Sequence, residues 1–175
     1  MTRFVIVLTL VCVVAALVLG LTYNVTKPLI AAQEEKTKKE ALARVLPGAN
    51  DYRQKMLDEK EYYEGYKGGE FIGYAIYALG KGYAGDINML VGIDKDGRIL
   101  GVEILSQQET PGLGARCVEN KRGEEEPWFL KQFNGKEASG LSLKSVEVIT
   151  GATITTDSIV KAIKKEAEVF LENIK

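Results

Sequence analysis

The segment Thr150-Gly151-Ala152-Thr153 has the residue types and the position of a phosphate site, because it lies between an apolar stretch and a long helical pattern. Backbone N–H groups at the start of a helix have no acceptor within the helix and carry a partial positive charge, which suits a phosphate. Gly151 and Ala152 leave room for a ligand near the main chain, and the threonine hydroxyls add donors. The same residues also fit an ordinary turn into a helix that a threonine caps. Taken alone, the local pattern favours this structural interpretation.

A second segment, Glu109-Thr110-Pro111-Gly112-Leu113-Gly114, places two glycines around one apolar side chain. Backbone of this kind suits a flat ring, and it equally suits a turn into a short helix. The spacing is not G-x-G-x-x-G, so it gives no support to a Rossmann dinucleotide site. A third segment, Gly80–Gly85, is glycine-rich and is interpreted as a structural hairpin loop.

The composition excludes most chemistry by side chains. The 175 residues include no histidine, which excludes Ser-His-Asp triads, H-E-x-x-H zinc sites and histidine-ligated haem. The two cysteines, Cys12 and Cys117, are too few for an iron–sulfur cluster or an all-cysteine zinc site. The formal net charge of −1 argues against a nucleic-acid partner. Any redox activity would therefore depend on an organic cofactor.

The N-terminal stretch predicts a membrane anchor. Residues 4–21 are apolar except Thr9 and Gly20, and about 20 helical residues cross the hydrocarbon core of a bilayer. A cleaved signal peptide has a shorter apolar region of about 7–15 residues and an A-x-A-like site, which Val18-Leu19-Gly20 matches poorly. The count of lysines and arginines on the two sides weakly favours a cytoplasmic location for the following chain.

Three parts follow from these patterns: a transmembrane anchor (1–26), a juxtamembrane helix or stalk (27–48) and a domain (49–175). Pro28 suits the first turn of a new helix, and Pro47-Gly48 ends its pattern. Within the domain, alternation and turn signals predict a sheet, and 3.6-residue periodicity predicts a long C-terminal helix. Strands are expected at Gly69–Leu79, Ile87–Ile93, Ile99–Leu105 and Ser145–Ile149, short helices or structured loops at Pro111–Val118 and Pro127–Phe133, and the long helix at Thr155–Ile174. The predicted fold class is α+β with a mainly antiparallel sheet and flanking helices.

Considered together, these motifs resemble one known family. Thr150–Thr153 followed by a helix resembles the flavinylation motif of the G subunit of Rnf complexes, which also occurs in the C subunit of the sodium-translocating NADH:quinone oxidoreductase. The runs at 109–114 and at 82–87 (Gly-Tyr-Ala-Gly-Asp-Ile) and the single anchor are similar to this family as well. The family motif usually has an aspartate six residues before the modified threonine, where this chain has Glu147.

The resemblance implies a flavoprotein that carries electrons. It implies FMN joined by a phosphoester to Thr153, which is the attachment point and not a catalytic residue. The other residues expected around the cofactor are Glu109, Thr110, Gly112, Leu113, Gly114, Thr150, Gly151 and Ala152. No metal site is expected, although Cys12 could share a metal centre with a cysteine of a partner helix.

By resemblance, the chain is a single-pass protein of the cell membrane and part of an ion-translocating ferredoxin:NAD oxidoreductase, without a complete active site of its own. Its flavin domain is expected on the extracytoplasmic or periplasmic side, against the charge count. Its expected partners are the other subunits of the complex, the lipid bilayer, and a flavin transferase that uses FAD and magnesium. The alternatives are the quinone-reductase C subunit and a membrane-anchored binding module in which Thr153 only caps a helix.

Overall fold

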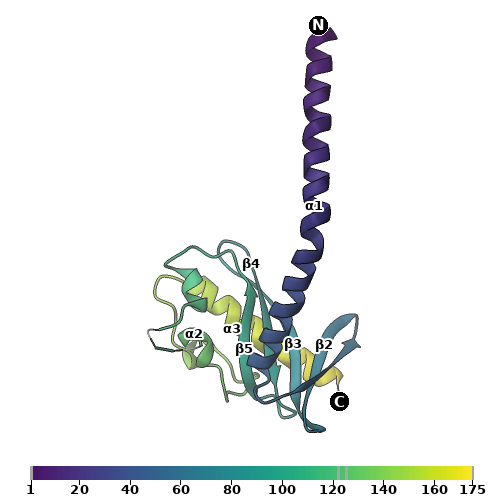
Figure 1. Cartoon of the computed structure of the whole chain (residues 1–175). Helices are drawn as coiled ribbons and strands as arrows, with labels where there is room; N and C mark the ends of the chain where they lie inside the picture. Colours follow the sequence, from purple (N-terminus) through teal and green to yellow (C-terminus); the bar gives the residue numbers. More distant parts are fainter. Residues whose placement is uncertain (1, 122, 125, 175) are drawn as a thin grey trace. The chain divides into compact units, whose positions relative to one another are not determined.

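The computed structural model describes residues 2–121, 123–124 and 126–174, and it divides into two compact units, Met1–Lys39 and Glu40–Lys175. The second unit contains an antiparallel sheet with helices on its two faces (Figure 1). The elements are α1 (Thr2–Val45), β1 (Asp51–Leu57), β2 (Lys60–Lys67), β3 (Glu70–Lys81), β4 (Asp86–Ile93), β5 (Ile99–Ser106), the 3₁₀ helix η1 (Gly114–Val118), α2 (Trp128–Lys131), the 3₁₀ helix η2 (Leu143–Ser145) and α3 (Thr153–Asn173).

Helix α1 is continuous through Pro28, so the expectation that a new helix begins at this proline is wrong. A proline in a helix interior costs about 3 kcal/mol because it removes one backbone hydrogen bond and crowds the preceding turn. The segment Thr2–Pro28 is long and apolar enough to cross a membrane. An anchor at the N-terminus is therefore compatible with the structure.

The sheet is a meander in which each strand pairs with its neighbour in the chain, in the order β1-β2-β3-β4-β5. The predicted strands that became β3, β4 and β5 are confirmed, and a turn at Asp96-Gly97, where Gly97 has a φ of +82°, joins β4 to β5. Like β2, strand β1 is an addition to the prediction. It joins β2 through a tight turn in which Asp58 and Glu59 both have positive φ.

The alternation along β3 separates two cores, one on each face of the sheet. Ile76 and Ala78 belong to the larger core, which α3 covers on one face (Figure 1). Ala75 belongs to the smaller core on the opposite face, together with Leu90. The last turn of α1 covers this second face with Ala41, Leu42, Val45 and Leu46, all of which are at most 3% exposed.

Two glycines on the sheet, Gly92 and Gly101, allow the backbone of that last turn to lie directly against the strands. A Cβ atom at Gly92 would lie 1.8 Å from the carbonyl oxygen of Val45, and one at Gly101 would lie 2.7 Å from the carbonyl oxygen of Arg44. The side chain of Arg44 also forms an ion pair of 2.6 Å with Glu103 on β5. Backbone-to-backbone contact of this kind requires residues without side chains on the sheet.

The strand predicted at Ser145–Ile149 is wrong, because the described chain has η2 and then an unpaired extended segment there. Ser142 and Ser145 satisfy the backbone of η2 through a reciprocal capping box. The backbone N–H and C=O of Glu147 then bond to the side-chain amide of Gln132, at 2.6 and 3.2 Å. The polar backbone groups that a strand partner would have satisfied are thus bonded to side chains.

Candidate functional site

The predicted segments meet at one cavity of about 480 Å³. They are the loop after β3, the loop after β5 and the start of α3, which lie far apart in the sequence. A volume of this size lies within the roughly 300–1,000 Å³ that is usual for cofactor sites. The lining residues are Tyr83, Glu109, Thr110, Leu113, Gly114, Gly151, Ala152, Thr153, Ile154 and Thr155.

The N-terminus of α3 opens into this cavity and suits an anion. The helix begins at Thr153, two residues earlier than predicted, and its N-cap is Ala152. Within the described chain no side-chain hydrogen bond caps it, and its first turn contains no acidic residue. The N–H groups of the first turn have no intrahelical acceptor and stand at the positive end of the helix dipole. The structural interpretation expected a threonine as the N-cap of this helix, but the N-cap residue is Ala152.

The four threonines near this helix start differ sharply in exposure. Thr150 and Thr153 are exposed, whereas Thr155 and Thr156 are 1% and 0% exposed. The hydroxyl of Thr156 donates to the carbonyl of Ala152 at 3.0 Å and accepts from the N–H of Ile149 at 3.2 Å. These two bonds hold the turn that precedes the helix. Of these four threonines, only Thr153 combines an exposed side chain with a place in the cavity wall.

Glu109 lies in the wall of the cavity and is 5% exposed. One of its carboxylate oxygens accepts a hydrogen bond from the N–H of Ala84 at 2.9 Å, and the other accepts one from the hydroxyl of Thr155. An ionised carboxylate acts only as an acceptor, and both of these bonds match that role. Its side chain therefore binds the loop after β3 and the start of α3.

The cavity has apolar walls that suit a flat ring. Tyr83 is 75% exposed, Leu113 is 45% exposed and Ile154 is 56% exposed, and all three line the cavity. Leu113 also lies over Gly151, where a Cβ atom would be 3.0 Å from the leucine Cδ2. The sequence interpretation placed Leu113 here and missed Tyr83 and Ile154. An aromatic residue inside a glycine-rich loop was the signal for Tyr83, and nothing in the pattern marked Ile154.

Two of the predicted site residues, Gly112 and Thr150, do not line the cavity, and neither does the motif position Glu147. Gly112 has a φ of +75° and no described atom within 4 Å of an added Cβ, so its backbone conformation, not clearance, requires glycine. Thr150 is exposed just before Gly151. Glu147 is exposed, and its backbone is held by Gln132 as described above.

The two cysteines lie in different surroundings. Cys12 is on the exposed surface of the apolar part of α1. Cys117 in η1 is fully buried, and burial raises the pKa of its thiol to about 11, with the negative charge of Glu109 adding to the shift. Among the described residues, no three histidine, cysteine, aspartate or glutamate side chains gather as a metal site would need.

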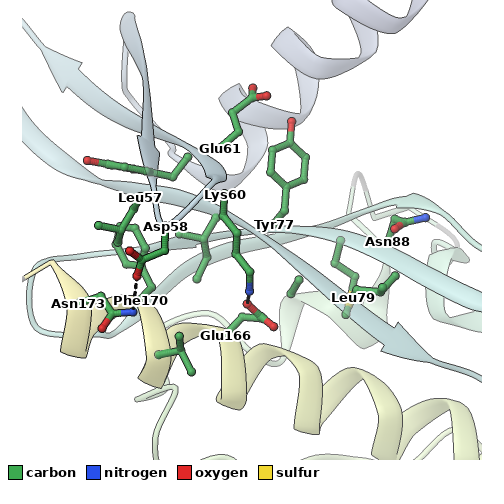
Figure 2. A pocket seen from close by; sticks show the side chains of 15 residues that line it. Leu57, Asp58, Lys60, Glu61, Tyr77, Leu79, Asn88, Glu166, Phe170 and Asn173 are labelled. Carbon is green, nitrogen blue, oxygen red and sulfur yellow. Dashed lines mark hydrogen bonds and ion pairs between the residues drawn. The ribbon is translucent and has the colours of Figure 1, made fainter.

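A second cavity of about 420 Å³ lies between the β1–β2 turn and the C-terminal half of α3 (Figure 2). Figure 2 shows Lys60 reaching across it to Glu166, an ion pair of 2.5 Å, and Asn173 donating to Asp58 at 3.0 Å. The rest of its wall is mostly apolar and includes Leu57, Leu79 and Phe170. None of the predicted site residues lines this cavity.

Comparison with known proteins identifies two regions of the chain. Residues 82–168 match the family model of the FMN-binding domain, and residues 1–45 match that of the RnfG N-terminal region. The first match includes all three segments around the 480 Å³ cavity.

Solved structures confirm the fold. The chain is similar to NqrC of Shewanella oneidensis, with a TM-score of 0.54 and 19% identity over 76% of this chain and 72% of that one. It is also similar to the C subunit of the Na(+)-translocating NADH-quinone reductase of Parabacteroides distasonis, with a TM-score of 0.60 and 18% identity over 81% of this chain and 94% of that one. At these identities the likeness shows the fold alone.

Relatives with higher identity show the family. The chain is 33% identical over 168 residues to the G subunit of the proton-translocating ferredoxin:NAD(+) oxidoreductase complex of Clostridium ljungdahlii, covering 92% of this chain and 86% of that protein. It is 31% identical over 188 residues to the G subunit of the Na(+)-translocating ferredoxin:NAD(+) oxidoreductase complex of Acetobacterium woodii, covering 94% and 88%. The sequence resemblance is thereby confirmed, and the chain belongs to the family of G subunits of the ion-translocating Rnf oxidoreductase complexes.

Proposed function

We propose that this chain is the electron-carrying subunit of a membrane-bound, ion-translocating ferredoxin:NAD(+) oxidoreductase and that its FMN is joined by a phosphoester to Thr153. Its membership of the Rnf G-subunit family and the FMN-binding match over residues 82–168 support the electron-carrier role. The same relatives favour this role over that of a quinone-reductase C subunit, to which only the fold is linked.

The observation that carries the attachment is the position of Thr153 itself. Its side chain is exposed, it is the first residue of α3, and it lies in the wall of the cavity. A phosphate on its hydroxyl would stand at the positive end of the helix dipole, within reach of N–H groups that lack an intrahelical acceptor. Neither buried threonine, Thr155 or Thr156, offers a reactive hydroxyl to an external enzyme.

The rest of the cavity would hold the ring. Leu113, Gly151 and Ala152 form an apolar wall beside Thr153, and Thr110 and Gly114 form the adjoining part. Thr150 and Gly112 would shape the two turns that present these residues. When bound, FMN supplies the isoalloxazine that accepts and releases electrons, which no side chain of this chain can do.

Attachment would require a flavin transferase that uses FAD and magnesium. The hydroxyl oxygen of Thr153 would attack the flavin-side phosphorus of FAD, the phosphoanhydride bond would break, and AMP would leave. The hydroxyl proton passes to a base on the transferase. Covalent attachment of this kind leaves the isoalloxazine unaltered and prevents loss of the cofactor from a domain outside the cytoplasm.

The N-terminal helix would place this domain at the membrane. We assign the anchor to residues 1–26, the stalk to 27–48 and the flavin domain to 49–175, with the flavin on the extracytoplasmic or periplasmic side. The segment Thr2–Pro28 supports a single span, and the relatives support assembly with the other subunits of the complex. Electrons would reach the flavin through those partner subunits, because an apolar helix offers no redox group.

The test is the intact mass of the chain produced together with its flavin transferase. The expected mass increase is one FMN less one water, on a peptide that contains Thr153, and the yellow colour should survive denaturation. Thr153→Ala should abolish the increase, whereas the control Ser139→Ala, which removes an exposed hydroxyl outside the cavity wall, should retain it. Covalent flavin on the Thr153→Ala chain would refute the assignment, and a colourless wild-type chain would favour the non-redox binding module.

A further inference from the structure

We infer that Glu109 is a positioning residue of the flavin site, whose buried carboxylate joins the three segments of the cavity wall through Ala84 and Thr155. This inference rests on the proposed function, because it concerns where the ring of a flavin on Thr153 would lie. It differs from the expectation that Glu109 contacts the cofactor, since it assigns the contact to other residues of the wall.

The hydrogen bonds of Glu109 leave little of it for a ligand. The carboxylate accepts from the N–H of Ala84 in the loop after β3 and from the hydroxyl of Thr155 in the first turn of α3. The residue itself lies in the loop after β5, which also carries Leu113, and is 5% exposed. A buried carboxylate must have its oxygens satisfied, and here the protein satisfies both. The side chain therefore fixes three wall segments relative to one another.

Gly82 and Gly114 leave room for the carboxylate of Glu109, which explains these glycines without reference to the flavin ring. A Cβ atom at Gly82 would lie 2.4 Å from one carboxylate oxygen of Glu109, and a Cβ atom at Gly114 would lie 2.4 Å from the other. The same Cβ at Gly114 would also lie 2.6 Å from the hydroxyl oxygen of Thr155. Glycine at both positions is thus explained by the close packing of Glu109 and Thr155.

This arrangement predicts that the length and hydrogen bonding of the side chain at position 109 matter more than its charge. Glutamine has the same length, and its amide can accept from Ala84 and donate to the hydroxyl oxygen of Thr155. Aspartate keeps the charge but is one methylene shorter, so it cannot reach both partners. If charge mattered most, Glu109→Asp would be the milder substitution. If length and hydrogen bonding matter most, Glu109→Gln is the milder one.

The experiment uses the full chain in detergent, loaded with flavin by its transferase, and measures iodide quenching of the flavin fluorescence. Thr155→Val should expose the ring and increase the quenching, and Thr155→Ser, which keeps the hydroxyl, should restore wild-type protection. The control is Ser158→Ala, which removes a buried hydroxyl of the same helix that has no hydrogen-bond partner in the described part of the structure. Folding of each variant is checked by the fluorescence of Trp128.

A folded Thr155→Val chain that fails to load flavin, with loading restored by serine, would support the inference equally. Quenching in Thr155→Val equal to that in Ser158→Ala would overturn it. If Thr155→Val does not fold, the pair at position 109 decides: Glu109→Gln should protect the ring and Glu109→Asp should not, and the reverse order would overturn the inference.

A wild-type chain without added mass would refute the proposed function, and the inference with it, whereas full loading with equal protection in every variant refutes the inference alone.

Discussion

Replacing Gly92 with alanine should destabilise the sheet domain by lifting the last turn of α1. The new Cβ would lie 1.8 Å from the carbonyl oxygen of Val45 and 2.6 Å from its carbonyl carbon. These neighbours are backbone atoms, so no flexible side chain can move aside. The turn has to rise from the sheet until ordinary van der Waals contact is restored.

The size of the effect follows from what that turn buries. Overpacking a well-packed core costs about 1–3 kcal/mol, and losing the burial of an aliphatic side chain costs about 1.5–3 kcal/mol. Val45 and Leu46 are both 0% exposed, so even partial undocking affects two complete side chains. We expect a loss of about 3 kcal/mol in the free energy of unfolding. At an m-value of about 2 kcal/mol per molar urea, the unfolding midpoint should fall by about 1.5 M.

The assay is urea unfolding of the full chain in detergent, followed by the fluorescence of Trp128, the single tryptophan of the chain. The matched control is Gly140→Ala, because its Cβ would meet the nearest described atom at 3.6 Å, an ordinary contact. A midpoint for Gly92→Ala within error of that control would refute the close packing of the last turn of α1 against Gly92.

Three further predictions concern titration, reactivity and orientation. Burial alone would raise the pKa of Glu64, but hydrogen bonds from Lys55 and Tyr66 hold it below its ordinary value of 4.5. The stability that Glu64 contributes should therefore be full above pH 4.5 and decline as the pH falls further, so the stability difference between wild type and Glu64→Gln should shrink in acid; a constant difference would contradict this. Cys117 is buried with a pKa of about 11, so maleimide at pH 7 should modify it slowly until denaturant is added. A cysteine at the exposed Ser139 should instead react with an impermeant maleimide in intact spheroplasts, and labelling only after lysis would place the domain in the cytoplasm.

Local patterns predicted β3, β4 and β5, and they missed β2, where a charged residue and a glycine interrupt the tyrosines. The alternation in β3 is regular because Ile76 and Ala78 face one core while Ala75 faces the other. Strand β1 was not predicted because most of it is exposed on both faces, so its sequence carries no apolar period. The segment 146–149 after η2 has the composition of a strand, but side-chain partners such as Gln132 replace the hydrogen bonds of a neighbouring strand, and this depends on tertiary contacts.

The site was predictable as a set of segments but not as an arrangement. Small residues and threonines marked the start of α3, and the glycines marked the loop at 109–114 as places of close approach. The local pattern could not show that Thr153 is exposed and Thr155 buried, because both belong to the same threonine-rich segment, and only the family resemblance singled out Thr153. Nor could it show that Gly82 and Gly114 accommodate Glu109, because those residues meet only after the chain has folded.

The last turn of α1 also decides where the chain can be shortened for production in soluble form. A chain that starts after the helix, at residue 49, would lack Ala41, Leu42, Val45 and Leu46. It would expose the sheet surface around Tyr63, Ala75 and Leu90, an apolar patch of the kind that promotes aggregation. A start at Glu40, the first residue of the second compact unit, removes the apolar segment Thr2–Pro28 and keeps both cores covered. A soluble version of the chain should therefore begin within α1, before the last turn that packs on the sheet.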